Sequence, residues 1–399
     1  MVSISPRNGR GSSETSNSTT LSDPVELLKR TLSVKPVMST TSSKASRMQR
    51  ASVAPDRENF RTIGLGSCGS VFEVPGTELA YKKGSIESEI WKDFCLTNKV
   101  HIAGTTARHM LQNIFPELMI PRTPRCHNYH PADDEAFWSA KTVQRFPPGH
   151  RTRKPLFAVD RILPLPQKSR EALIDLFFDQ SPATQQEARD DVENKDCLVR
   201  TYLGERESEE QVEMVYNSLR NFPLRLNMME DLGLEIMAIA NEIAVGLAIM
   251  HWQAKVDAMD VEFVLGSAVT WDDDQPVLFH DLSAAPHTVR AISFKRRTVH
   301  LWMFDFDKAS EVNFTIDDVN GKLVPAFLGN DPYYPMPHID RDLWDSFSGT
   351  YIKASEAILR NNKADESVMG LPKRFLDEVV RRAEENKAWD EEDNVVFAV

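Results

Sequence analysis

The stretch Gly64-Leu65-Gly66-Ser67-Cys68-Gly69-Ser70-Val71-Phe72 decides the fold, because its glycines follow the spacing G-x-G-x-x-G-x-V. Glycines at this spacing allow a tight turn that brings backbone N–H groups close to phosphate oxygens. Phe60–Leu65 and Ser70–Val74 are rich in strand-forming residues, so the turn is predicted between two strands. A dinucleotide-binding fold would place the motif between a strand and a helix. The spacing therefore favours a phosphate-binding lid, with a hairpin that binds no ligand as the alternative.

A second motif, Ala80-Tyr81-Lys82, follows on the next predicted strand. A lysine in this pattern points toward nucleotide phosphates and needs an acidic partner on the following helix. That helix is predicted from Ile86 to Ala103, because apolar residues recur there at helical spacing. Glu89 is the first choice for the partner and Glu87 the second. The alternative is a solvated pair of lysines, since Lys83 is adjacent.

Two acidic motifs lie beside predicted strands further along the chain. Asp257 and Glu262 stand five residues apart after the apolar helix predicted over Leu234–Met250. Asp257 is a candidate base that accepts a hydroxyl proton, and Glu262 a candidate ligand for Mg²⁺, which prefers oxygen. The apolar run Leu301–Phe304 leads into Asp305, the candidate main metal ligand. The alternatives are a polar helix-to-strand turn and an acidic turn after a strand.

Charge argues against several classes of partner. The 399 residues carry 47 Lys+Arg and 59 Asp+Glu, for a formal net charge of −12. An acidic surface repels nucleic-acid phosphates, so we expect no nucleic-acid partner. The most apolar stretch, Leu234 to Trp252, contains Glu235 and Glu242, so we expect no membrane span. No signal peptide is recognisable. We therefore expect a cytoplasmic protein, with the nucleus as the alternative.

The cysteines argue against a disulfide framework and a zinc finger. There are four, they lie far apart, and no CxxC pair occurs among Cys68, Cys95, Cys126 and Cys197. Reduced thiols are expected instead. His127 and His130 lie near Cys126 and could suggest a metal site. A fourth ligand at usable spacing is missing, so exposed histidines on a proline-rich loop are the preferred interpretation.

The first 55 residues differ from the rest of the chain. They contain 19 Ser+Thr and neither Trp, Tyr nor Phe. Such a segment cannot bury enough surface to offset its chain entropy, so a disordered tail is predicted, with a short helix around Pro24–Leu32 as an exception. Arg30-Thr31-Leu32-Ser33 and Arg50-Ala51-Ser52 place arginine shortly before serine. Phosphorylation is a hypothesis for both, against chance matches in a serine-rich tail.

The order of these motifs resembles the protein-kinase-like fold. More narrowly, the chain resembles an uncharacterised fungal family, domain of unknown function 3669, over roughly residues 58–360. The blocks that carry this narrower resemblance are Val159–Pro166, Asp260–Gly266, Asp305–Lys308 and Asn330–Pro335.

The resemblance implies an α+β, two-lobed fold. A tail (1–55) would precede a β-rich N-lobe with one helix (56–165) and a mainly helical C-lobe (166–399) with an insertion around 267–300. It implies ATP and Mg²⁺ as cofactors. The expected sites fall into three groups: phosphate binding by Gly64, Gly66, Gly69 and Lys82 with Glu89, a base at Asp257, and metal ligation by Glu262 and Asp305.

Two functions remain open at this point. The first is an ATP- and Mg²⁺-dependent phosphotransferase that acts on an unknown protein or small molecule. The second is a pseudokinase that serves as a protein-interaction or signalling module with an unknown protein partner. Three departures from kinase motifs motivate the second: Lys255-Val256 replaces His-Arg, Glu262 replaces Asn, and Asp307 replaces the Gly of D-F-G. Coincidental motifs in an unrelated globular protein are a third interpretation.

Overall fold

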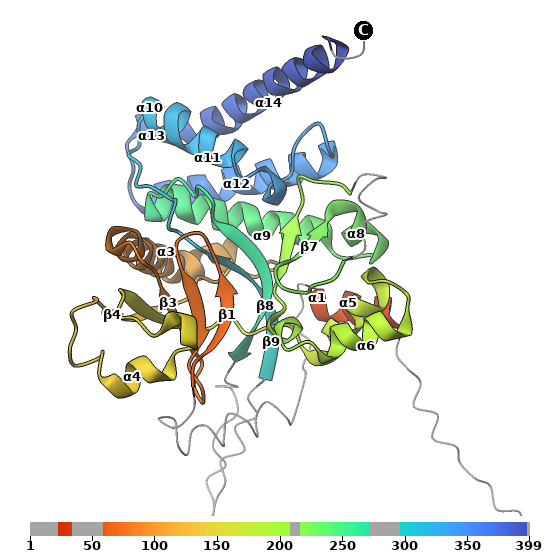
Figure 1. Ribbon diagram of the computed structural model, residues 1–399. Helices are drawn as coiled ribbons and strands as arrows, with labels where there is room; N and C mark the ends of the chain where they lie inside the picture. The colour runs from red at the N-terminus through yellow and green to blue at the C-terminus, as the bar shows by residue number, and fades with distance from the viewer. Residues whose placement is uncertain (1–22, 34–58, 208–215, 271–295, 397–399) are drawn as a thin grey trace, which may run out of the picture.

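Two β-sheets and a layer of helices make up the part of the chain that the computed structural model describes, residues 23–33, 59–207, 216–270 and 296–396. The fold is α+β, as predicted. The first sheet is built entirely from residues before position 161, and most helices follow it in the chain. Figure 1 shows the first sheet beside the second, with helices stacked on one side of both, namely α9 (Ile236–Ala248), α12 (Arg341–Asn361) and α14 (Leu371–Val396).

The first sheet has five strands in the order β1-β2-β3-β5-β4, and every neighbouring pair is antiparallel. The predicted strands around the glycine motif and through Lys82 are confirmed. Gly76 has φ 75°, which is the left-handed conformation that a type II turn requires between the second and third strands. The strands are β1 Arg61–Leu65, β2 Ser70–Glu73, β3 Leu79–Lys83, β4 Cys126–His130 and β5 Leu156–Asp160.

A long helix, α3 (Glu87–Ile114), connects β3 to β4. It runs past the predicted end at Ala103, because Ala107 and Leu111 continue its buried face. The helix packs against β4 and β5, where Ile90 contacts Cys126 and Phe157, and also against the π-helical turn that follows α9. The helix therefore bridges the first sheet and the helical layer. Two short elements, α4 Ala140–Arg145 and η2 Pro148–His150, precede β5.

The second sheet has four strands in the order β7-β6-β8-β9. The strands β8 and β9 pair antiparallel over their whole length, with Glu262 opposite Phe304. Part of the insertion predicted around 267–300 therefore extends these two strands, while residues 271–295 lie outside the described part. The strands are β6 Val199–Tyr202, β7 Phe222–Arg225, β8 Glu262–Thr270 and β9 Arg296–Phe304.

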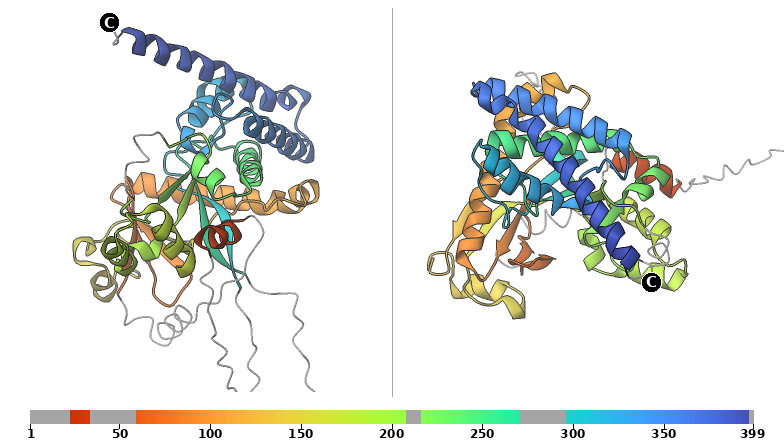
Figure 2. Two further views of the ribbon diagram at one scale, coloured as in Figure 1. Left: turned by 90° about the vertical axis from the view of Figure 1, so that its right-hand side faces the viewer. Right: turned by 90° about the horizontal axis from the view of Figure 1, so that it is seen from above.

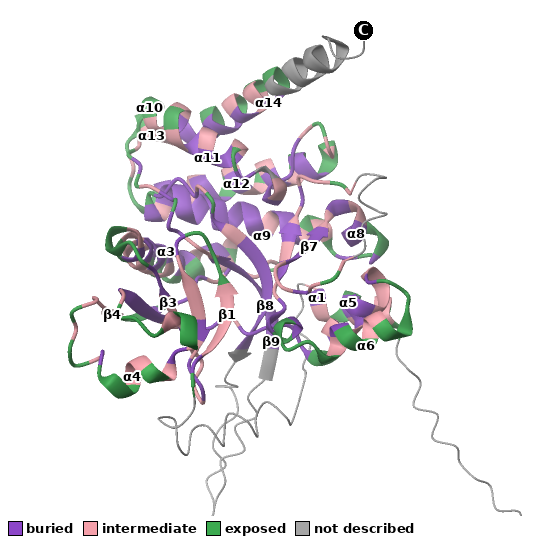
Figure 3. Ribbon diagram, in the orientation of Figure 1, coloured by how far each residue is buried: buried purple, intermediate pink, exposed green. Residues whose placement is uncertain are grey.

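The most apolar helix forms the centre of the core. α9 (Ile236–Ala248) and the π-helical turn η4 (Ile249–Ala254) pack on α12, and Figure 3 shows α9 almost wholly buried. This stretch is long and apolar enough to cross a membrane, but 72% of it is buried inside the fold. Its composition is that of a core helix.

The remaining helices surround this centre, and Figure 2 shows α14 crossing the top of the helical layer. They are α5 Gln167–Phe177, α6 Pro182–Asp190, η3 Glu193–Asp196, α8 Leu226–Asp231, α10 Ile316–Asp318, η5 Val319–Leu323, α11 Val324–Leu328, η6 Asp331–Tyr333, α12 Arg341–Asn361, α13 Glu366–Met369 and α14 Leu371–Val396.

One part of the predicted tail is folded. Pro24–Leu32 forms the helix α1, at the position where a short helix was predicted. Leu28 and Leu32 are fully buried in the main core, so residues 23–33 belong to the folded body. The rest of the predicted disordered segment, residues 1–22 and 34–55, lies outside the described residues.

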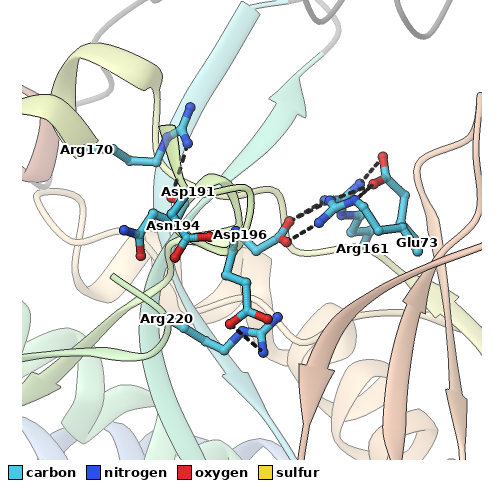
Figure 4. A network of polar contacts seen from close by, with 9 residues as sticks. Glu73, Arg161, Arg170, Asp191, Asn194, Asp196 and Arg220 are labelled. Atoms are coloured by element: carbon cyan, nitrogen blue, oxygen red, sulfur yellow. Dashed lines mark hydrogen bonds and ion pairs between the residues drawn. The ribbon is translucent and has the colours of Figure 1, made fainter. Parts of the chain in front are cut away.

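A ring of four charged side chains connects the two sheets (Figure 4). Arg61 of β1 and Arg161, just after β5, each pair with both Glu73 of β2 and Asp196 of η3. The Arg161 guanidinium lies 2.7 Å from Glu73 and 3.1 Å from Asp196. Arg161 and Asp196 are almost fully buried, so water screens these attractions weakly. The ring fixes the first sheet against the segment that leads into the second.

Candidate functional site

Lys82 is surrounded by carboxylates from distant parts of the chain. Its Nζ lies 2.5 Å from Asp93 Oδ2 on α3 and 2.5 Å from Asp305 Oδ1, directly after β9. A third carboxylate, Asp307 Oδ2, lies 3.5 Å away. The strand β3, the helix α3 and the end of the β8–β9 hairpin therefore meet at one ammonium group.

Asp93 also orders the segment that carries Asp305. Its Oδ1 accepts hydrogen bonds from Thr97 Oγ1 (3.0 Å) and from the backbone N–H of Phe306 (3.1 Å). The Asp93 side chain is 2% exposed, so these bonds replace the water that the carboxylate loses. The helix therefore contacts both Lys82 and the backbone that follows Asp305.

The acidic partner of Lys82 lies on the predicted helix, but one turn later than the predicted Glu89. Asp93 forms the ion pair, and Glu89 and Glu87 are not among the partners of Lys82. Glu89 and Asp93 are four residues apart and share one side of the helix, but only Asp93 lies on its buried face. Ile90, Asp93 and Thr97 lie at helical spacing, and the structure shows that all three are buried.

The charges of this cluster are arranged around one cation, the Lys82 ammonium group. Burial disfavours the charge of Lys82, yet the carboxylates of Asp93 and Asp305 raise its pKa well above the ordinary value. Burial raises the pKa of Asp305, and Lys82 only partly opposes this rise. Burial acts on Asp307 in the same direction, but the Cys68 thiol and Lys82 hold its pKa below the usual range. Three carboxylates around one ammonium group leave negative charge that can attract another cation.

The glycine motif forms the turn between β1 and β2, with Gly64 in β1 and Gly66 and Gly69 in the turn. Gly66 N–H donates to Gly69 O at 2.9 Å, which closes the turn. Lys308 Nζ donates to Cys68 Sγ at 3.3 Å. The tip of the turn thus contacts the residues that follow Asp305.

The two other predicted acidic residues have protein partners of their own. Asp257 is buried, and its Oδ1 accepts the backbone N–H groups of Met259 (3.1 Å) and Ser310 (2.8 Å). Burial raises its pKa. Glu262 pairs through both oxygens with the Arg200 guanidinium, with Nε 3.1 Å from Oε2. Burial raises the pKa of Glu262 to about 7, although Arg200 opposes this rise.

Glu262 and Asp305 lie at the same end of the β8–β9 hairpin. Glu262 pairs in register with Phe304, the residue before Asp305. Carboxylates are the ligands that Mg²⁺ prefers, so this donor set fits the predicted ion by its chemistry. Among the described residues, however, no group of three His, Cys, Asp or Glu side chains could hold a metal ion on its own. Two protein carboxylates with phosphate and water oxygens would be the remaining arrangement.

Unusual backbone conformations gather around the same residues. Asp305 has φ 68°, and Ala258 and Asp260 in the loop between η4 and β8 have φ 64° and 60°. Lys255, which ends the π-helical turn, has φ 58°. Non-glycine residues seldom adopt this left-handed conformation, and such strain concentrates at functional sites. Among the described non-glycine residues, Asn221 and Lys363 also have positive φ, but the other four such residues lie in or beside the two acidic motifs.

Lys83 faces the opposite side of β3 from Lys82. Its Nζ donates to the carbonyl oxygens of His150 (2.7 Å) and Thr152 (2.6 Å), and lies over the rings of Trp138 and Phe146. Burial lowers its pKa to about 8. Both lysines are therefore enclosed by the protein, and the alternative of a solvated lysine pair is wrong.

The histidines near Cys126 lie in a strand that was not predicted. Cys126–His130 is β4, at the edge of the first sheet, instead of a loop. The ring nitrogens of His127 and His130 lie 2.7 Å from Asp160 and 2.8 Å from Asp134. Each pair is separate, so neither histidine belongs to a described metal-ligating cluster.

The end of β9 and the helices after it are also the region that resembles a known family. Residues 301–363 match the family of domain of unknown function 3669. That family is described as a zinc finger protein family. The matched residues contain Asp305 and Asp307, but only one histidine, His338, and no cysteine. They cannot supply a Cys/His zinc site. No curated protein matches the chain.

Proposed function

We propose that this chain is a kinase-like protein that binds ATP with Mg²⁺ and transfers the terminal phosphoryl group to a protein or small molecule. The position of Lys82 between Asp93 and Asp305 carries the proposal. Protein kinases need a strand lysine paired with an acidic residue on the next helix, and an aspartate of the D-F-G segment beside them. Here an Asp on α3 takes the place of the usual Glu.

The topology around Lys82 supports a kinase-like, two-lobed fold. A glycine-rich turn joins β1 to β2, Lys82 lies on β3, and a single long helix separates β3 from β4. Asp257 and Glu262 follow the core helix and precede the β8–β9 hairpin, and Asp305 ends that hairpin. This is the order of parts in the kinase signature set.

Each residue then has a role in phosphoryl transfer. The backbone at Gly64, Gly66 and Gly69 would surround the phosphates, and Lys82 would move from Asp305 toward them. Glu262 and Asp305 would hold Mg²⁺, which neutralises phosphate charge when bound. One carboxylate oxygen of Asp257 accepts two backbone N–H groups. The other oxygen would take the proton of an acceptor hydroxyl.

A pseudokinase is the second candidate, and Arg200 is the observation that favours it. The guanidinium occupies both oxygens of Glu262, the position where kinases use an uncharged Asn. Lys308, through Cys68, also keeps the glycine turn against the segment after Asp305. A protein that kept these contacts would bind a partner without turnover.

Nucleotide binding by the full chain tests the proposal. ATP with Mg²⁺ at about 100 times its dissociation constant should stabilise the fold by about 2.7 kcal/mol. Gly66→Ala adds a methyl group that meets only Gly69 O at 3.7 Å, so it leaves the fold intact. We expect it to weaken ATP binding in calorimetry by about tenfold. Asp305→Asn should abolish the dependence of binding on Mg²⁺.

Lys373→Gln on exposed α14 is the matched control and should bind ATP like the parent chain. Loss of binding in Gly66→Ala and Asp305→Asn, with ADP formed in the presence of an acceptor, would support the phosphotransferase. Binding without turnover against a range of acceptors would favour the pseudokinase. A folded chain that binds no ATP would contradict the proposed nucleotide site.

A further inference from the structure

The helix α1 is a short segment held on the body by apolar side chains, with Val25 and Leu27 partly buried beside Leu28 and Leu32. Leu28 and Leu32 are fully buried in the core, and α1 packs along α5 (Figure 1). Isolated helices shorter than about 12 residues are marginally stable in water. A nine-residue helix such as α1 therefore depends on its docked position.

Ser33 ends this helix at a carboxylate of the body. Its Oγ donates to Glu235 Oε2 at 3.0 Å, and Glu235 is the exposed residue that precedes α9. The hydroxyl of Thr31 donates to Leu27 O within the helix. Arg30 precedes Ser33 by three residues, the spacing that basophilic protein kinases recognise. Of the Thr31 and Ser33 hydroxyls, that of Ser33 therefore lies at the end of the docked helix and contacts the body.

We propose that Ser33 is a phosphorylation site of an ATP-dependent basophilic Ser/Thr protein kinase, and that its phosphorylation releases α1 from the body. Ser33 Oγ forms a bond to the terminal phosphorus of ATP while the bond from that phosphorus to the β-phosphate oxygen breaks. ADP leaves, and the modifying kinase takes the hydroxyl proton. The product carries a phosphate of about −1.5 to −2 charges.

The charges around Ser33 favour release. In the docked helix the phosphate would face the Glu235 carboxylate of the body. Lys29 and Arg30 in the last turn attract a phosphate, but they belong to α1 and accompany it in both states. Only a contact that differs between docked and released states can shift the equilibrium. The hydrogen bond to Glu235 is a contact of this kind.

Hydrogen exchange of the full chain tests this proposal, with phosphoserine encoded at position 33. We expect the backbone amides of residues 28–32 to exchange at least about tenfold faster than in the unmodified chain, equivalent to about 1.4 kcal/mol. In Glu235→Lys the new ammonium can pair with the phosphate, so exchange in α1 should return to the unmodified rate. Ser33→Ala, which removes the exposed hydrogen bond to Glu235, should change exchange far less.

Equal exchange in the phosphorylated and unmodified chains would overturn the proposal. Faster exchange that persists in Glu235→Lys would also overturn it, because the effect would then not come from Glu235. In a separate arm, the folded chain is incubated with ATP and a purified basophilic kinase. Phosphate on Ser33 by mass spectrometry supports the site, and a folded chain that remains unmodified there contradicts it.

Discussion

Replacing Lys82 with methionine is expected to lower the free energy of unfolding by about 3–5 kcal/mol. The substitution removes the ammonium group that lies between Asp93 and Asp305, and leaves the buried Asp93 carboxylate and the partly buried Asp305 carboxylate without it. Removal of one partner from a buried ion pair leaves an uncompensated charge, which is costly away from water. Urea denaturation followed by circular dichroism measures the loss.

The loss of unfolding free energy in Lys82→Met should also depend on pH. Burial already raises the pKa of Asp305, and Lys82 is the group that opposes this rise. An acid whose pKa is raised in the folded state lowers stability as the pH rises from its unfolded pKa through its folded pKa. The loss in Lys82→Met is therefore expected to be larger at about pH 8 than at about pH 5.

Lys99→Met is the control for this prediction. Lys99 pairs with Glu311, but the two side chains are 36% and 68% exposed. An exposed pair contributes less than about 1 kcal/mol, so this variant should resemble the parent chain. If the two variants lost stability equally, the cluster around Lys82 would not be the buried arrangement described above.

Replacing Gly69 with alanine is expected to destabilise the fold by about 3 kcal/mol. A Cβ at Gly69 would lie 2.4 Å from Lys83 O and 3.2 Å from the Cα of Gly84, both backbone atoms. Backbone atoms cannot turn aside as a side chain can, so the glycine turn would have to separate from β3. Thermal unfolding of the variant measures the effect.

Gly66→Ala provides the comparison within the same motif. Its added methyl group meets Gly69 O at an ordinary contact distance of 3.7 Å, so the change in stability should be below about 0.5 kcal/mol. Gly69 would then be required for packing, and Gly66 would be free to serve a ligand. A melting temperature for Gly69→Ala equal to that of Gly66→Ala would contradict this difference.

The sequence predicted β1, β2 and β3 and the helices α3 and α9, because their apolar or strand-forming residues recur at the spacing of each element. It could not predict β4, since Cys126–His130 is mostly polar and lies at the edge of the sheet. It identified α3 but not which of its acidic residues reaches Lys82. That choice depends on how the helix is rotated against β3, and the rotation is set by buried residues such as Ile90.

The sequence identified the candidate acidic residues of the site, but it did not identify the groups that contact them. Asp257, Glu262 and Asp305 stand out by their positions after a helix or a strand. The Arg200 partner of Glu262 lies 62 residues earlier, and Ser310, which donates to Asp257, lies 53 residues later. Such pairs arise only when the second sheet and the core helix assemble, so local spacing contains no signal for them.

The two adjacent lysines of β3 have a consequence for how the first sheet assembles. Lys82 faces carboxylates on one side of the strand, and Lys83 faces carbonyl oxygens and aromatic rings on the other. A slip of β3 by one residue would place either Tyr81 among the carboxylates or Gly84 against the carbonyls. Either mispairing leaves one environment without its ammonium group. The lysine pair thus disfavours both neighbouring registers and helps to specify the native alignment of β3.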